Sequence, residues 1–277
     1  MIVLAIARDL LAEARSRRWV LAFLGGATLL LAAVAFGLRF EVVDGALAAT
    51  RLFGGDLKSD VRSVDVALRP LFVATSYLVF YCGLVFGVVA TADFAPALLA
   101  PGRIEPLLAL PVRRWQVLAG TFLGVEALVL AAALYGGAGV ALLLWLKTGV
   151  ANAGPLVAAA SAAVAFAPIY AAMLTAALGV RSAALSGGAG LLLLVAGVVA
   201  GNRAAVAELF QPGASRSVFL GVTSLLPRLS ALAKVAAAAS ESRPVPGGPL
   251  LALVAGTLAF ALAVLALGVD RFERRDF

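Results

Sequence analysis

The stretch that decides how this chain is organised is residues 93–116, DFAPALLAPGRIEPLLALPVRRWQ, which separates the second and third long apolar runs. It is interrupted by Pro96, Pro101, Pro106 and Pro111. Proline lacks an amide donor and disfavours helix in the residue before it, so one long regular helix is excluded here. The apolar side chains between the prolines are too few to cross a bilayer. We expect the segment to stay at a membrane surface, either as a short helix resting on lipid or as a helix that docks on a soluble partner.

The composition of the rest of the chain indicates an integral membrane protein. Hydrophobic residues make up 63% and charged residues 13% of the 277 residues, and the mean hydropathy is +1.05, far from the balance of a soluble domain. Apolar runs of about 20 residues can cross the hydrocarbon core as helices. We predict a single all-α membrane domain, residues 1–277, with six transmembrane helices at residues 19–38, 71–92, 117–146, 155–180, 183–201 and 249–269.

The first apolar run has a second interpretation, because four arginines precede it and residues 33–35 resemble a signal-peptide cleavage site. Its length exceeds the roughly 7–15 residues of a signal core, which favours a retained span.

The distribution of basic residues predicts the orientation. With six spans both termini share one side, and the density of arginine in short loops favours the cytoplasm for both. The arginines of that side are Arg8, Arg15, Arg17, Arg18, Arg103, Arg113, Arg114, Arg181, Arg271, Arg274 and Arg275. The net charge of +7 then reflects topology and contact with anionic headgroups of the lipid bilayer, and no nucleic-acid partner is expected.

Several kinds of chemistry are excluded by the residues that are missing. The chain has no histidine, and its single cysteine, Cys82, lies inside an apolar run, which argues against Cys/His metal sites, disulfides within the chain and His-based acid–base relays. None of its three lysines completes the G-x-x-x-x-G-K-[ST] phosphate loop. We therefore expect no catalytic residues, no metal site and no cofactor bound by this chain.

Three other regions are polar or amphipathic. Residues 1–18 have apolar positions at helical spacing and predict an interfacial amphipathic helix, or a charged flank that only orients the first span. Residues 39–69, with charges of both signs, predict a solvated external loop without a metal site. Residues 202–248 predict an external loop with an amphipathic helix on the outer leaflet, whose apolar face includes Leu225, Leu226, Leu229 and Leu232.

The charged residue Glu126 lies well inside the third span. A charge at the centre of a bilayer costs about 2.5–3.5 kcal/mol on insertion scales, so such a residue normally finds water, a partner or a proton. Because the position is about three turns from the cytoplasmic end, a snorkelling or arginine-paired structural role is favoured over contact with a substrate.

The central segment resembles the G-x-[LI]-E-x-L-L-x-x-P-[VI]-x-R pattern of type-2 ABC exporter permeases. The arginine-rich start of the chain and the ending at residues 271–277, RFERRDF, are similar to the two ends of that family. The resemblance implies that residues 93–116 form the coupling segment seated on a separate ABC-type ATPase subunit. The implied contact residues are Gly102, Arg103, Ile104, Glu105, Leu107, Leu108, Pro111, Arg113 and Arg114.

The family further implies an exporter of the bacterial cytoplasmic (inner) membrane, in which two permease chains, alike or different, pair with two cassettes. ATP and Mg²⁺ would bind the partner ATPase, and the helix between the fifth and sixth spans would gate the external end; the alternative is an interfacial helix without a transport role. Two other functions stay open. One is a cofactor-maturation permease, similar to those serving nitrous-oxide reductase or cytochrome c assembly, and the other is a membrane anchor that moves nothing.

Overall fold

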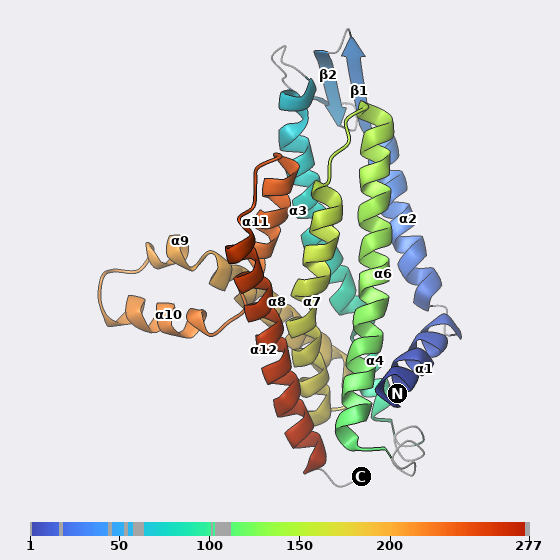
Figure 1. The fold of residues 1–277 in the computed structure, drawn as a ribbon, viewed down its shortest axis with the longest axis vertical. Coiled ribbons are helices and arrows are strands. Elements are labelled where there is room, and N and C mark those ends of the chain that lie inside the picture. The colour runs from blue at the N-terminus through green and yellow to red at the C-terminus, as the bar shows by residue number, and fades with distance from the viewer. Residues whose placement is uncertain are drawn as a thin grey trace.

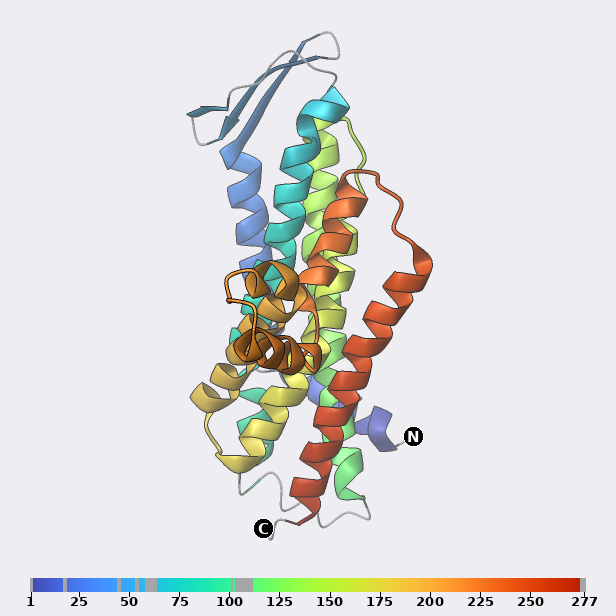
Figure 2. The same ribbon diagram turned by 90° about the vertical axis from the view of Figure 1, so that its left-hand side faces the viewer.

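The computed structural model describes residues 2–16, 19–43, 46–52, 55–57, 64–100, 102 and 112–274. Figures 1 and 2 show an elongated bundle of helices that run roughly along its long axis. The helices are α1 (Ile2–Ser16), α2 (Trp19–Gly37), α3 (Val64–Thr91), α4 (Phe94–Leu98), α6 (Arg114–Thr148), α7 (Gly154–Gly179), α8 (Ala183–Gly201), α9 (Arg203–Ala207), α10 (Ala214–Ser224), α11 (Leu229–Ser240) and α12 (Gly247–Glu273).

The long helices are those of a multi-pass membrane protein. Within the described residues, α3, α6, α7, α8 and α12 are long and apolar enough to cross a bilayer, and the number becomes six if α10 and α11 are counted as one broken span. Helix α2 coincides with the predicted first span; that it crosses the membrane, and that there are six spans in all, stay predictions. Helices α3 and α6 extend past the predicted spans, because hydropathy marks the part of a helix inside hydrocarbon and not its end.

A small sheet lies outside the helical body. Strands β1 (Leu38–Val43), β2 (Ala46–Leu52) and β3 (Gly55–Leu57) form an antiparallel sheet in that order, at the end of the bundle opposite the two termini (Figure 1). Val43 pairs with Ala46 across the Asp44-Gly45 dipeptide, which is a strong hairpin signal. The prediction of an all-α chain therefore holds for the membrane body, while the loop predicted over residues 39–69 contains these strands and the first residues of α3.

Helix α7 is the centre of the bundle. It packs against α3, α6, α8, α11 and α12, and its window of greatest hydropathy is 67% buried inside the protein, compared with 11% for α12. Alanine dominates its sequence, and small side chains let neighbouring backbones approach closely. Phe166 and Tyr170 fill the larger gaps and are fully buried.

The region between α8 and α12 differs from the single surface helix predicted for it. It contains three helices, the short α9 followed by α10 and α11, and the last two are bent by 71° relative to each other. The break falls at Pro227, which cannot donate the helical hydrogen bond and disfavours helix before it. Helix α11 packs into the bundle against α7, α3 and α8, whereas α9 and α10 project sideways (Figure 1). The stretch predicted as one amphipathic helix is therefore divided between α10 and α11, and its placement on the outer leaflet stays a prediction.

Candidate functional site

The candidate site is the end of the bundle where α1, α4, the start of α6 and the last turn of α12 lie (Figures 1 and 2). The central segment leaves α3 through α4, whose residues Ala95, Pro96 and Leu98 are buried. Helix α4 contacts α7 and α8. The first edge of the segment is thus seated against the core and does not lie on the surface as a free loop.

Most residues predicted to contact an ATPase lie outside the described residues. They are Arg103, Ile104, Glu105, Leu107, Leu108 and Pro111. Gly102 is exposed in a turn, and a Cβ added to it would meet nothing within 4 Å. Arg113 is also exposed, and its backbone amide donates a hydrogen bond of 3.0 Å to the side chain of Gln116, which caps the start of α6. Gly102 and Arg113 are therefore accessible to a partner.

Arg114 links the second edge of the segment to the last turn of α12. Its guanidinium donates hydrogen bonds to the carbonyl oxygens of Phe272, at 2.9 Å, and Glu273, at 3.2 Å. The guanidinium carbon also lies 5.9 Å from the centre of the Phe272 ring, within the range of a cation–π contact. The last carbonyls of a helix have no partners within it and carry partial negative charge, so an arginine there stabilises the helix end. Sequence reasoning assigned Arg114 to the ATPase and missed this partner, which lies 158 residues further along the chain.

The amphipathic helix predicted at the N-terminus is present as α1, and its buried face is turned toward α6. The residues of α1 that are buried are Ala7, Leu10 and Ala14, whereas Ile2 is exposed and Ile6 is half-buried. Gly120 and Gly124 of α6 make this approach possible, because a Cβ on Gly120 would lie 2.7 Å from the Cβ of Ile6. Helix α1 is therefore attached to the same helix that carries Arg114.

Glu126 lies deeper, in the interface of α6 with the core. It is half-buried, its Oε1 atom is buried without a hydrogen-bond partner, and it has no ion pair among the described residues. The arginine pair predicted as one possibility for Glu126 is thus not found in the described part of the chain. The hydroxyl of Tyr170 in α7, which is fully buried, also has no hydrogen-bond partner. The rings of Phe122 and Phe166 stack on Tyr170 with centroids 6.2 and 5.9 Å away. Each of these unpaired polar atoms offers a hydrogen-bond partner to a water molecule or a polar ligand atom.

The four predicted gate residues fall in different environments. Leu225 is 77% exposed at the bend and Leu226 is half-buried, whereas Leu229 and Leu232 of α11 are buried in the core. Leu229 packs over Gly197 of α8, where an added Cβ would lie 2.4 Å from its Cγ. The structure therefore does not bring the four leucines together on one face.

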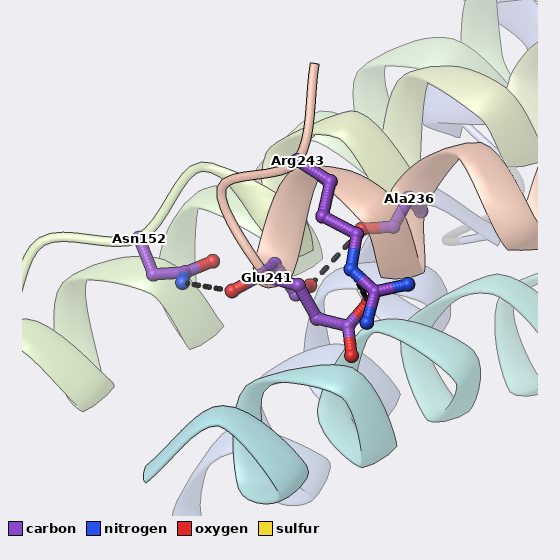
Figure 3. A network of polar contacts seen from close by, with 5 residues as sticks. Asn152, Ala236, Glu241 and Arg243 are labelled. Atoms are coloured by element: carbon purple, nitrogen blue, oxygen red, sulfur yellow. Dashed lines mark hydrogen bonds and ion pairs between the residues drawn. The ribbon is translucent and has the colours of Figure 1, made fainter. Parts of the chain in front are cut away.

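A polar cluster fixes the far end of α11. The hydroxyl oxygens of Ser76 in α3 and Ser240 in α11 lie 2.7 Å apart and both residues are buried. Asn152 donates a hydrogen bond of 2.9 Å to the Ser240 carbonyl and accepts one of 2.8 Å from the amide of Gly154. Figure 3 shows Asn152 beside the end of α11, where Glu241 and Arg243 form an ion pair of 3.2 Å. Helices α3, α7 and α11 are thus joined by hydrogen bonds at this end.

Metal chemistry finds no support in the described residues, where no group of three or more His, Cys, Asp or Glu side chains could hold an ion. Cys82 is a free, exposed thiol on α3. No family model matches the chain, and no curated protein matches it. The resemblance in the central segment and at the two ends is therefore an argument from motifs alone.

Proposed function

We propose that this chain is the membrane-spanning permease subunit of an ATP-driven ABC exporter of the type-2 class, working with a separate ATP-binding-cassette subunit in a bacterial cytoplasmic membrane. Two permease chains would form the pathway, and ATP and Mg²⁺ would bind the cassettes. The proposal includes six spans with both termini in the cytoplasm.

The observation that carries the proposal is the way in which the central segment is attached at both edges. Before it, α4 is buried against α7 and α8. After it, Arg114 holds the last two carbonyls of α12 at 2.9 and 3.2 Å. A segment that only rested on lipid would not need such attachments, whereas a segment that passes force to the spans would.

The attachments also suggest how force would be transmitted. ATP binding would close the cassettes and push on residues 102–113, which are continuous with α6. Movement of α6 would carry α1, packed on it through Gly120 and Gly124, and would pull α12 through Arg114. The result would be a rigid-body shift of these helices relative to α7, and so a change in access from one side of the membrane to the other.

The charges of the same end support its placement in the cytoplasm. Described residues at this end include Arg8, Arg113, Arg114, Arg271 and Arg274, contributed by three helices and the segment itself. Basic residues concentrated in short connections are typical of the cytoplasmic side. They also provide charge for an acidic rim on the ATPase or for anionic lipid.

The test is co-purification from membranes with the candidate cassette ATPase, measuring complex yield and ATPase rate. The test variant carries Glu105→Arg and Leu108→Asp, which remove a predicted charged contact and a predicted apolar anchor. The matched control carries the same chemical changes on the projecting arm, Glu208→Arg and Leu209→Asp, where both residues are exposed. Loss of both readouts in the test variant alone, with membrane insertion intact, is the expected result.

Two outcomes would contradict the proposal in different ways. If the test variant bound and stimulated the ATPase normally, the coupling segment would be assigned wrongly. If the chain bound a partner without changing its ATP hydrolysis, an anchor or assembly role would be favoured. The cofactor-maturation function shares the same coupling and differs in cargo, so it is distinguished by loss of cofactor insertion in a partner enzyme.

A further inference from the structure

The connection between α8 and α11 leaves the helical bundle and returns to it. Helices α9 and α10 project sideways in Figure 1 and lie in front of the bundle in Figure 2, and α10 packs mainly on α9 and α8. The rings of Phe210 and Phe219 stack with their centroids 4.9 Å apart, and Thr223 is buried. One face of α10 is thus fixed to the protein.

A second face of α10 is apolar and exposed. Val218, Val222 and Leu225 follow one another at i, i+4 and i+7, so they lie on one side of the helix. They are 65%, 58% and 77% exposed. A helix with one exposed apolar face and basic residues beside it is typical of a helix that lies in the plane of a membrane interface.

The length of α8 gives the depth at which this connection begins. Helix α8 is one of the helices able to span a membrane, and its 19 residues extend about 28 Å at 1.5 Å per residue, close to the hydrocarbon thickness of about 30 Å. Its end at Gly201 therefore lies near the boundary between hydrocarbon and headgroups. Ser230 in the first turn of α11 donates a hydrogen bond of 3.1 Å to the carbonyl of Val198 in α8, so α11 begins close to the same depth.

The charge of this region is positive. Residues 202–234 contain one acidic residue, Glu208, and four basic residues, Arg203, Arg216, Arg228 and Lys234, which gives a net charge of +3. Lys234 donates a hydrogen bond of 2.8 Å to the side chain of Asn202. Within the part of the chain that the structure describes, the side chains of the three arginines make no hydrogen bond and no ion pair. Three guanidinium groups close to the headgroup boundary are therefore open to an anion.

This charge decides between the possible occupants of the exposed face. A second copy meeting this face with the same face would bring the same excess of positive charge, and like charges in an interface repel. A neutral lipid surface would leave the arginines without opposite charge. An anionic lipid surface supplies that charge, and each basic side chain near it strengthens binding about fivefold.

We propose that α10 and the junction of α8 with α11 bind anionic phospholipid. The apolar face of α10 lies against the first methylene groups of the acyl chains, and Arg203, Arg216 and Arg228 bind lipid phosphate groups. Arginine suits this role because its planar guanidinium donates two parallel hydrogen bonds to a phosphate. The proposal goes beyond the exporter function: it requires only that α8 spans the membrane and is independent of coupling to an ATPase.

The experiment measures amide hydrogen exchange of the full-length chain by mass spectrometry, with one copy in each lipid nanodisc. One set of nanodiscs contains phosphatidylcholine alone, and the other an equal mixture of phosphatidylcholine and phosphatidylglycerol. We expect exchange in α10 to be slower in the mixture by up to about a hundredfold, since three arginines contribute about fivefold each. Exchange in α7 should be the same in both, and added salt should reduce the difference in α10 because it screens exposed charges.

The matched variants remove the same charge from different places. The test variant carries Arg216→Gln and Arg228→Gln, and the control carries Arg69→Gln and Arg243→Gln, two exposed arginines outside the connection. The test variant should reduce the difference between the two lipid compositions by about 25-fold, and the control should keep it. Arg216→Gln alone, with about a fivefold reduction, serves if the double variant does not fold.

Three outcomes would overturn the proposal. The first is equal exchange of α10 in the two lipid compositions. The second is slow exchange of α10 in phosphatidylcholine after addition of inorganic phosphate, which would indicate a site for a phosphate ion and not a lipid surface. The third is slow exchange in phosphatidylcholine that appears only when each nanodisc holds two copies, because a second chain would then cover the face.

Discussion

The substitution Gly154→Ala should break the polar cluster that joins α3, α7 and α11. An ideal Cβ on Gly154 would lie 1.9 Å from the hydroxyl oxygen of Ser240 and 2.7 Å from that of Ser76. Both hydroxyl groups are buried between helices, so they have no free space into which to turn. The methyl group must either expel the Ser240 hydroxyl or separate the helices.

The expected cost follows from these contacts. Overpacking a well-packed interior costs about 1–3 kcal/mol, and loss of the hydrogen bond between Ser76 and Ser240 adds about 0.6 kcal/mol, the average for such bonds in a membrane. The better helix propensity of alanine returns at most about 1 kcal/mol. We therefore expect the free energy of unfolding to fall by about 2 kcal/mol.

The assay is unfolding by SDS titration from a fixed mild detergent, followed by the fluorescence of the three tryptophans. Gly179→Ala is the matched control, because it lies in the same helix and has nothing within 4 Å of an added Cβ. The control should leave the free energy of unfolding unchanged or raise it slightly. The reasoning is refuted if the two variants behave alike.

A double-mutant cycle tests the cause of the loss. Ser240→Ala removes the hydroxyl that the new methyl group would strike, at the cost of its hydrogen bonds. In the background of Gly154→Ala it should therefore recover part of the lost stability, so that the two changes are not additive. Purely additive losses would show that the clash with Ser240 is not the reason.

Three further predictions concern the other contacts. Tyr170→Phe should leave the free energy of unfolding unchanged or raise it by about 1 kcal/mol, since a buried group without a partner costs about 1–3 kcal/mol; a clear loss would reveal a partner for the hydroxyl. Arg114→Gln should speed amide hydrogen exchange in the last turn of α12, because the free energy of local opening there falls by about 1 kcal/mol when this half-exposed contact is lost. Unchanged exchange would contradict the link between Arg114 and α12. Gly120→Ala, with its Cβ 2.7 Å from that of Ile6, should cost about 1–3 kcal/mol and loosen α1, so that trypsin cuts sooner at Arg8; Gly136→Ala, which meets nothing, should not.

The long helices could be predicted from the sequence because a bilayer requires about 20 apolar residues in a row. Helix α8 occupies the predicted residues, Ala183–Gly201. The helix ends were less predictable. Helix α3 begins at Val64, among charged residues that were interpreted as loop. A helix keeps its backbone hydrogen bonds in water, so it can extend beyond the apolar run that predicts the span.

Two local signals were present in the sequence and were not used. Asp44-Gly45 between two alternating stretches is typical of a hairpin, and Pro227 is typical of a helix break. The remaining features depend on contacts between residues distant in sequence. No spacing rule brings Arg114 to Phe272, Ser76 to Ser240 or Phe122 to Tyr170, because these pairs are set by how the helices pack.

The position of α7 has a consequence for tolerance to mutation. In a soluble protein the most hydrophobic helix is usually the most buried, but here the apolar surface of α12 faces outward while alanine-rich α7 is enclosed. Replacing a buried alanine of α7 with a larger residue adds volume where no space exists, whereas exchanges among leucine, valine and phenylalanine on the outer face of α12 leave the side chain in the same surroundings. A scan of all substitutions should therefore find its strictest positions among the smallest side chains of the chain.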